Sequence, residues 1–223
     1  MKIKGFLEIA NLPPIDRIGE ILQSSAIRKV IHFCLGPDGT NIHQAAEAWS
    51  LERGLSEKAE IKFCETPEVC LTECRQLNGK NILGFFWTCA VYFKLHELFF
   101  TNRDCLPFFV NFTMALDTMQ LATRVEKVKE INGCIPVGWK IASHPSPAPL
   151  LNGHRRIMLV DSNSAAAKAC SEGMADGCIT TESARLIHGL EKIGEYGSPQ
   201  MVFFAGITEA GARLVANAYQ LLQ

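Results

Sequence analysis

Two junctions place hydroxyl groups where an apolar run gives way to a helical pattern. Residues 36–40, Gly-Pro-Asp-Gly-Thr, follow the apolar run at 30–35, and Ser162 and Ser164 open a later helical pattern. The first N–H groups of a helix have no helical partner, so such an end can receive a carboxylate or a phosphate. A structural N-cap alone also explains either junction. No Walker lysine follows the first one, which disfavours a nucleotide, whereas two such ends suit a ligand with two carboxylates.

A histidine followed by two prolines is the third candidate. Ser143 and His144 begin the run Ser-His-Pro-Ser-Pro, which follows an apolar segment at 139–142. Polar side chains after a strand lie at the edge where α/β sheets bind ligands. Imidazole changes charge near neutral pH, so His144 can position or protonate a bound acid. A histidine that only stabilises its own loop fits the pattern equally well.

Short apolar runs alternate with helical patterns along the chain. The predicted strands lie at 30–35, 61–64, 81–88, 139–142, 158–160 and 177–180, and the predicted helices at 12–27, 41–54, 66–77, 162–174 and 208–222. This alternation predicts an α/β fold with largely parallel sheets. Parallel strands end at a common edge, so the fold would bring the junction residues to the carboxyl ends of the strands.

Composition excludes several classes of partner. The chain has 223 residues, 48% of them hydrophobic, with a formal net charge of −1 and no stripe of Lys or Arg, so we expect no nucleic acid. No secretory hydrophobic region is present near the N-terminus, and the apolar run at 106–116 is about half of a membrane span, so we expect a cytoplasmic protein without a membrane partner.

Nine cysteines without an export signal indicate reduced thiols. Cys70 and Cys74 could form half of a zinc site, but no second pair exists, and we expect no metal and no cofactor.

The order of these motifs resembles that of prephenate dehydratases over about residues 30–207. The resemblance rests on 36–40 with Gln44-Ala45-Ala46, Ser143-His144-Pro145, Ser162 with Ala166-Ala167, and Cys178-Ile179-Thr180 with Ala184 and Gly189-Leu190. It implies a two-lobed, periplasmic-binding-protein-like α/β fold with the ligand in a cleft between the lobes, and a homodimer. We expect a lead-in helix at 1–27, one lobe from 28–114 with 198–223, and a second lobe from 115–197.

Departures from the family pattern change the expected chemistry. Val202 and Phe203 stand where the dehydratases carry the Thr and Arg of a Thr-Arg-Phe motif, and no hydroxyl lies between Gln200 and Gly206. Thr88 and Cys89 take the place of the family's Glu-Asn-Ser segment. The bacilysin-type prephenate decarboxylase branch also lacks the threonine, and the chain resembles it further at 66–70, 143–147, 180–185 and His96.

The resemblance implies a carbon–carbon lyase of secondary metabolism, in antibiotic biosynthesis. Without a donor at the ring hydroxyl of prephenate, loss of CO2 leaves the electrons in the ring and a ring carbon must be protonated. The catalytic candidates are His144, Thr40 and Arg185; Arg124 is an alternative source of charge, and Arg185 can equally be a solvated helix residue. The candidate residues that bind the small anionic cyclic substrate are Pro37, Gly39, Thr40, Thr88, Cys89, Ser143, His144, Ser162, Ser164 and Thr180.

Other functions fit the same residues. The ligand can be a different ring acid of a tropone-type or other natural-product pathway, or the protein can be a module that binds an anionic ligand without turnover; dehydration is a weaker alternative. Cys89 is expected to be an inert buried thiol, and His43 to be exposed on its helix. The stretch 95–117 is interpreted as a dimer surface or a lid.

Overall fold

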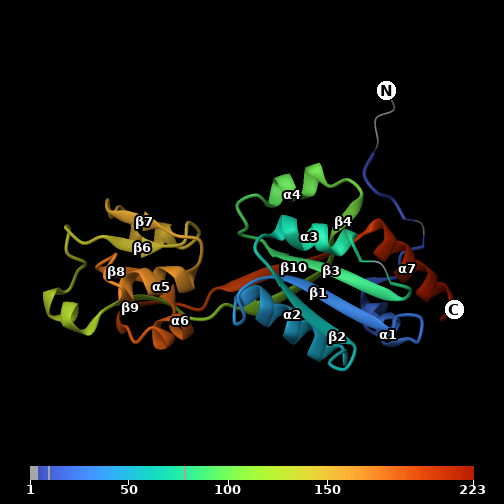
Figure 1. Cartoon of the computed structure of the whole chain (residues 1–223), viewed down its shortest axis with the longest axis horizontal. Coiled ribbons are helices and arrows are strands. Elements are labelled where there is room, and N and C mark those ends of the chain that lie inside the picture. Colours follow the sequence, from blue (N-terminus) through green and yellow to red (C-terminus); the bar gives the residue numbers. More distant parts are fainter. Residues whose placement is uncertain (1–4, 10, 78) are drawn as a thin grey trace. The chain divides into compact units, whose positions relative to one another are not determined.

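The chain divides into two α/β units (Figure 1). The computed structural model describes residues 5–9, 11–77 and 79–223. Unit 1 consists of Met1–Met114 and Met201–Gln223, and unit 2 of Ala115–Gln200. Each unit has one five-stranded sheet with helices packed against it.

Unit 1 has the strand order β2-β1-β3-β10-β4. Strands β1, β2 and β3 are parallel, and β10 runs antiparallel to β3. The elements are η1 Ile15–Arg17, α1 Ile18–Gln23, β1 Lys29–Leu35, α2 Asn41–Glu52, β2 Ala59–Cys64, α3 Pro67–Arg75, β3 Ile82–Cys89, α4 Leu95–Thr101, β4 Cys105–Ala115, β10 Gln200–Thr208 and α7 Glu209–Gln220. Because β1 and β3 are covered on both faces, their sequences are nearly continuous apolar runs.

Neighbouring side chains of the central strands point to opposite faces of the unit 1 sheet. On one face, His32 and Trp87 pack around Trp49 of α2. On the other face, Phe33 and Phe86 pack with residues of α3 and α4. Figure 1 accordingly shows α2 and α3 on opposite sides of the sheet.

Unit 2 has the strand order β7-β6-β8-β5-β9, with β6, β7 and β8 parallel and β5 antiparallel to both β8 and β9. Its elements are β5 Met119–Thr123, η2 Val125–Glu130, β6 Ile141–Ser143, η3 Ala148–Leu151, β7 Ile157–Leu159, α5 Asn163–Ser171, β8 Gly177–Thr181, α6 Glu182–Ile187 and β9 Glu191–Gly197. Buried alanines, including Ala142, Ala166 and Ala167, separate α5 from the sheet. Small side chains allow a helix backbone to approach the strands closely, which fixes the start of α5 near the sheet edge.

Five helices begin at a Thr or Ser whose side-chain oxygen accepts a backbone N–H three residues on; these caps are Thr40, Thr66, Ser162, Thr181 and Thr208. Each cap satisfies one N–H group of the first turn and contributes about 1 kcal/mol to stability. All but Thr208 stand just after a strand of a parallel set, so the helices start at the carboxyl edge of their sheet.

Two features of the fold differ from the sequence predictions. The sheets are mixed, because β5, β9 and β10 are antiparallel to their neighbours. The stretch 95–117 contains α4 and the edge strand β4, so the part from Cys105 to Ala115 belongs to the sheet and does not form a lid. Among the described residues, no helix combines the length and apolar character needed to cross a bilayer.

Candidate functional site

The loop after β1 is fixed by side chains of the helix that follows it. The Thr40 hydroxyl donates to the carbonyl oxygen of Leu35 at 2.8 Å and accepts the backbone N–H of His43 at 3.3 Å. Gly39 has φ +80°, a left-handed conformation that favours glycine. The amide of Gln44 donates to the Gly39 carbonyl at 3.0 Å. The loop is therefore preorganised, and the proton of the Thr40 hydroxyl is already used within the protein.

His43 is buried, so its expected exposure is wrong. Its ring packs edge-on against Phe63, with centroids 5.0 Å apart, and only 11% of its side chain is exposed. Its Nδ1 accepts the backbone N–H of Gly39 at 3.1 Å. The ring thus connects the loop to α2. In the sequence, the four-residue spacing between Gly39 and His43 is the one indication of this role.

Thr88 and Cys89 end β3 at the same carboxyl edge. Thr88 is fully buried, and its hydroxyl has no hydrogen-bond partner among the described residues. By strand alternation Thr88 shares the face of Phe86, which is the α3 face and not the α2 face. Burial raises the pKa of the Cys89 thiol, and hydrogen bonds from the backbone of Val91 and Tyr92 offset this only in part. Cys89 therefore stays protonated and is a weak nucleophile.

In unit 2, His144 lies at the carboxyl end of β6. The Ser143 hydroxyl donates to the His144 carbonyl at 2.9 Å, and the Ser146 N–H donates to His144 Nδ1 at 3.2 Å. Burial lowers the pKa of His144, and the nearby carboxylate of Asp161 opposes this shift. The ring is therefore neutral at neutral pH, with its proton on Nε2, where it can act as a hydrogen-bond donor.

The start of α5 forms the second junction. The Ser162 oxygen accepts the N–H of Ala165 at 3.0 Å, and the buried Thr180 hydroxyl donates to the Asn163 carbonyl at 2.8 Å. Ser164 is exposed. The side-chain oxygen Oδ1 of Asn163 is buried and has no partner among the described residues, which makes it an acceptor that sequence analysis did not identify. Thr180 thus positions the helix end instead of offering its proton to a ligand.

Arg185 is bonded inside unit 2. Its Nε donates to Gln120 Oε1 at 2.7 Å, its Nη1 donates to the Leu190 carbonyl at 3.0 Å, and Glu182 lies 3.9 Å from Nη2. Arg124 likewise donates to the carbonyls of Cys170 and Ala175. These contacts stabilise the turns after α5 and α6. A catalytic role for Arg185 stays a prediction.

The predicted residues therefore form two separate groups. Pro37, Gly39, Thr40, Thr88 and Cys89 lie at the carboxyl edge of the unit 1 strands. The carboxyl edge of the unit 2 strands carries Ser143, His144, Ser162, Ser164 and Thr180. Sequence reasoning missed the roles of Asn163 and the buried Gln120 and expected His43 to be exposed, because burial and pairing partners decide what these side chains do.

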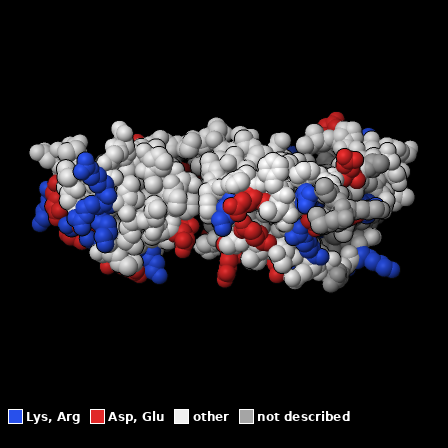
Figure 2. Space-filling model, turned by 90° about the horizontal axis from the view of Figure 1, so that it is seen from above, with Lys and Arg blue, Asp and Glu red and all other residues white. Residues whose placement is uncertain are grey.

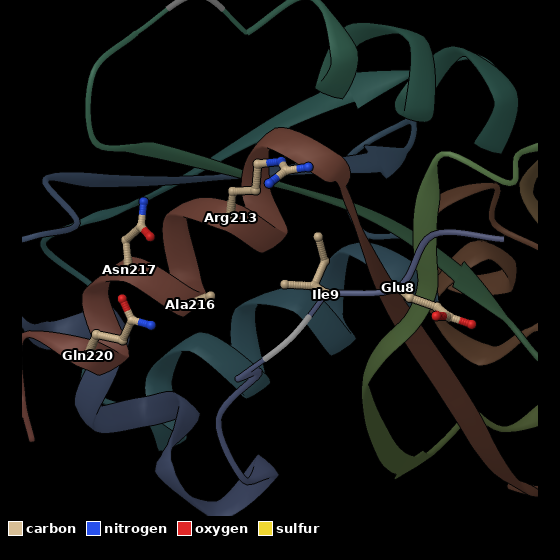
Figure 3. A pocket seen from close by; sticks show the side chains of 6 residues that line it. All are labelled: Glu8, Ile9, Arg213, Ala216, Asn217 and Gln220. Atoms are coloured by element: carbon tan, nitrogen blue, oxygen red, sulfur yellow. The ribbon is translucent and has the colours of Figure 1, made fainter. Parts of the chain in front are cut away.

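Two surface pockets of unit 1 are lined by residues outside these groups. One pocket, of about 240 Å³, lies between α7 and the segment near the start of the chain (Figure 3). It is lined by Arg213, Ala216, Asn217 and Gln220 of α7 and by Glu8 and Ile9. The other, of about 560 Å³, includes Lys29, Ala59 and Ile82 at the amino ends of β1, β2 and β3. α/β sheets bind ligands at the carboxyl ends of their strands, and this pocket lies at the amino ends. We therefore do not place the site there.

On the face drawn in Figure 2, charged side chains of both signs form small groups in a largely uncharged surface. This distribution, with a net charge of −1, gives no broad field that would attract a polyanion to that face. Recognition of an anion therefore depends on local donors such as the helix ends.

Comparison with known proteins identifies the fold. No family model and no curated protein matches the chain. The periplasmic VFT2 domain of Bordetella pertussis BvgS superimposes with a TM-score of 0.52 at 16% identity, over 95% of this chain and 94% of that one. The larger BvgS periplasmic domain gives 0.50 at 16% identity, over 95% and 43% of the two chains. A prephenate dehydratase from Staphylococcus aureus gives 0.46 at 14% identity, over 80% and 66%.

The likeness to the VFT2 domain confirms the predicted fold class. The chain has a periplasmic-binding-protein-like fold of two α/β units, each with a five-stranded sheet. The more specific resemblance to the bacilysin-type branch stays a prediction, as do the homodimer and the cytoplasmic location.

Proposed function

We propose that each unit offers a site for a small carboxylic acid, at the N-terminal end of α2 in unit 1 and at that of α5 in unit 2. The observation that supports this is the repetition of one arrangement in both units. In each unit a capped helix starts at the carboxyl edge of parallel strands. This helix is α2, with 12 residues, in unit 1 and α5, with 9 residues, in unit 2. Beside each start lies a side chain that can donate or accept a hydrogen bond. The partial positive charge of a helix N-terminus favours a carboxylate.

The charges near each junction limit the kind of acid. Asp38 precedes α2 and Asp161 precedes α5, and both are exposed. A carboxylate near the ligand disfavours a polyanion, so one carboxylate at a helix end is favoured over a phosphate. A hydroxyl on the same ligand can donate to the exposed carboxylate of Asp161. The class that fits best is a small hydroxylated carboxylic acid.

Binding is preferred over catalysis because most of the candidate catalytic groups already have partners. The hydroxyl proton of Thr40 and the Nε–H and one Nη1–H of Arg185 are directed to protein oxygens. Of the catalytic candidates, His144 retains a ring N–H that can face a ligand, since its Nδ1 is occupied by Ser146.

Isothermal titration calorimetry with prephenate, phenylpyruvate, shikimate and succinate tests the binding proposal. Thr40→Ala and Ser162→Ala each remove a cap at a proposed helix end, and we expect each to weaken binding at least threefold. Thr208→Ala removes the equivalent cap of α7, where no ligand is proposed, and is the matched control for loss of stability. Equal weakening by all three variants, or no heat with any acid, would contradict the proposal.

A second candidate function is decarboxylation of prephenate or a related cyclic acid without aromatisation. The observation that favours it is the apolar stretch of β10 beside the end of β3, where Phe203 pairs with Cys89 and Phe204 with Thr88. An apolar surrounding favours departure of a carboxylate as neutral CO2. The bond to the carboxyl carbon breaks, its electron pair enters the ring, a ring carbon takes a proton from water, which leaves hydroxide, and the ring hydroxyl is retained.

Incubation with prephenate separates the two functions. Release of CO2 with a product that keeps its hydroxyl, detected by mass, supports the lyase. Tight binding of prephenate without turnover supports the binding module alone. Formation of phenylpyruvate would show dehydration and refute the retained hydroxyl.

A further inference from the structure

His43 makes two contacts through one nitrogen atom. Its Nδ1 lies 3.1 Å from the backbone nitrogen of Gly39, which donates to it, and 2.9 Å from Asp38 Oδ1. On the other side of the ring, Nε2 lies 3.3 Å from Glu47 Oε1. Asp38 belongs to the loop at 36–40, and Glu47 lies one turn further along α2.

The two contacts of Nδ1 require opposite protonation states. An unprotonated Nδ1 has a lone pair that accepts the Gly39 N–H, but this lone pair then faces the carboxylate oxygen of Asp38. A protonated Nδ1 donates to Asp38 and has no lone pair left for Gly39. The arrangement therefore has two alternative hydrogen-bonding states, and the proton on His43 selects between them.

We infer that His43 is a proton-controlled latch on the loop at 36–40. When His43 is neutral, its Nδ1 holds the Gly39 N–H and its Nε2–H donates to Glu47. Taking up a proton makes both ring nitrogens donors, so the imidazolium pairs with Asp38 and Glu47. The backbone N–H of Gly39 then loses its acceptor on the ring. Asp38 can follow this change because 81% of its side chain is exposed.

The surroundings of the ring allow this change of charge. Asp38 from the loop and Glu47 from α2 favour the imidazolium, whereas the N-terminal end of α2 opposes it. From β2 the ring meets the uncharged side chain of Phe63.

The latch itself depends only on unit 1, while its effect on a ligand rests on the proposed function. If a carboxylate binds at the start of α2, release of the Gly39 N–H adds a donor there and binding strengthens as the pH falls. The structural test uses no ligand, so failure of every acid to bind leaves the latch testable.

NMR titration of the full chain from pH 8 to pH 5 tests the inference. We expect the ring nitrogens of His43 to show the Nε2–H tautomer at pH 8, and the Gly39 amide resonance to shift with the same midpoint as the His43 ring. A proton on Nδ1 at pH 8, or a Gly39 amide that does not follow the ring, would overturn the latch.

Two variants locate the responsible charges. Asp38→Asn and Glu47→Gln each remove one carboxylate beside the imidazolium, and we expect each to lower the shared midpoint. Glu52→Gln removes an exposed carboxylate near the far end of α2 and is the matched control, with an unchanged midpoint expected. Equal shifts in all three variants would indicate a general field effect and refute the assignment.

Discussion

The buried histidine of unit 1 makes the stability of the fold sensitive to acid. His32 is fully buried; its Nδ1 accepts the indole N–H of Trp87 at 2.9 Å, and its Nε2 lies 2.9 Å from Ser50 Oγ, which donates to the Ala46 carbonyl. The Phe85 ring stacks on it with centroids 5.5 Å apart. Both ring nitrogens are paired in the neutral state, and no counter-charge is present in this network. Burial therefore lowers the pKa of His32 to about 3.

The size of the effect follows from the difference between this pKa and the ordinary value of 6.5. Below pH 6.5 the unfolded chain takes up a proton at His32 that the folded chain does not. The stability from the neutral histidine is fully present above pH 6.5 and decreases by about 1.4 kcal/mol per pH unit below it, until the folded form also protonates near pH 3. From pH 7 to pH 5 the loss is about 2 kcal/mol, a large part of a typical stability of about 5–15 kcal/mol.

Urea unfolding at pH 5, 6, 7 and 8, followed by tryptophan fluorescence, measures this loss. Trp49 and Trp87 both contact His32, so they report on unit 1. The comparison variant is His32→Gln, whose amide can accept from Trp87 and donate to Ser50 but does not titrate. We expect the variant to be less stable at pH 7, and the difference between the two proteins to shrink by about 2 kcal/mol at pH 5.

Contributions from the other titrating groups are common to both proteins and cancel in this difference. His96→Gln serves as a control, because His96 is exposed and its removal should leave the pH dependence of wild type unchanged. Parallel stability curves for wild type and His32→Gln between pH 7 and pH 5 would refute the reasoning, since His32 would then gain its proton equally in the folded and unfolded states.

Three further outcomes are expected. Thr40→Ala should lower the free energy of unfolding by about 1 kcal/mol and weaken acid binding, whereas Thr208→Ala should lower only the stability; urea unfolding and calorimetry distinguish them. Arg185→Lys should lower the free energy of unfolding by about 2 kcal/mol in urea, because it leaves the buried Gln120 without its donor; a change under about 0.5 kcal/mol would contradict the bonded geometry. Iodoacetamide at pH 7.5 should modify the exposed Cys134 at least tenfold faster than Cys89, as judged by peptide mass, because burial raises the pKa of Cys89; comparable rates would show that Cys89 is accessible as a thiolate.

The sequence by itself determined the local elements of the parallel part of the fold. The apolar runs at 30–35 and 177–180 became β1 and β8, and Thr40 and Ser162 became N-caps as their positions predicted. Such features depend on side-chain pattern and on contacts three or four residues apart, which can be read from the chain. The antiparallel strands β5, β9 and β10 were not predicted, because they are stabilised by partners distant in sequence.

The tertiary structure decided what each candidate side chain does. Arg185 and Thr180 have the residue types of a binding site, yet their donors are taken by Gln120, by the Leu190 carbonyl and by the Asn163 carbonyl. His43, expected on the surface, is buried and fastens the loop before its own helix. A residue type limits the hydrogen bonds that a side chain can make, but burial and the partners that folding brings within about 3 Å decide which of them it makes.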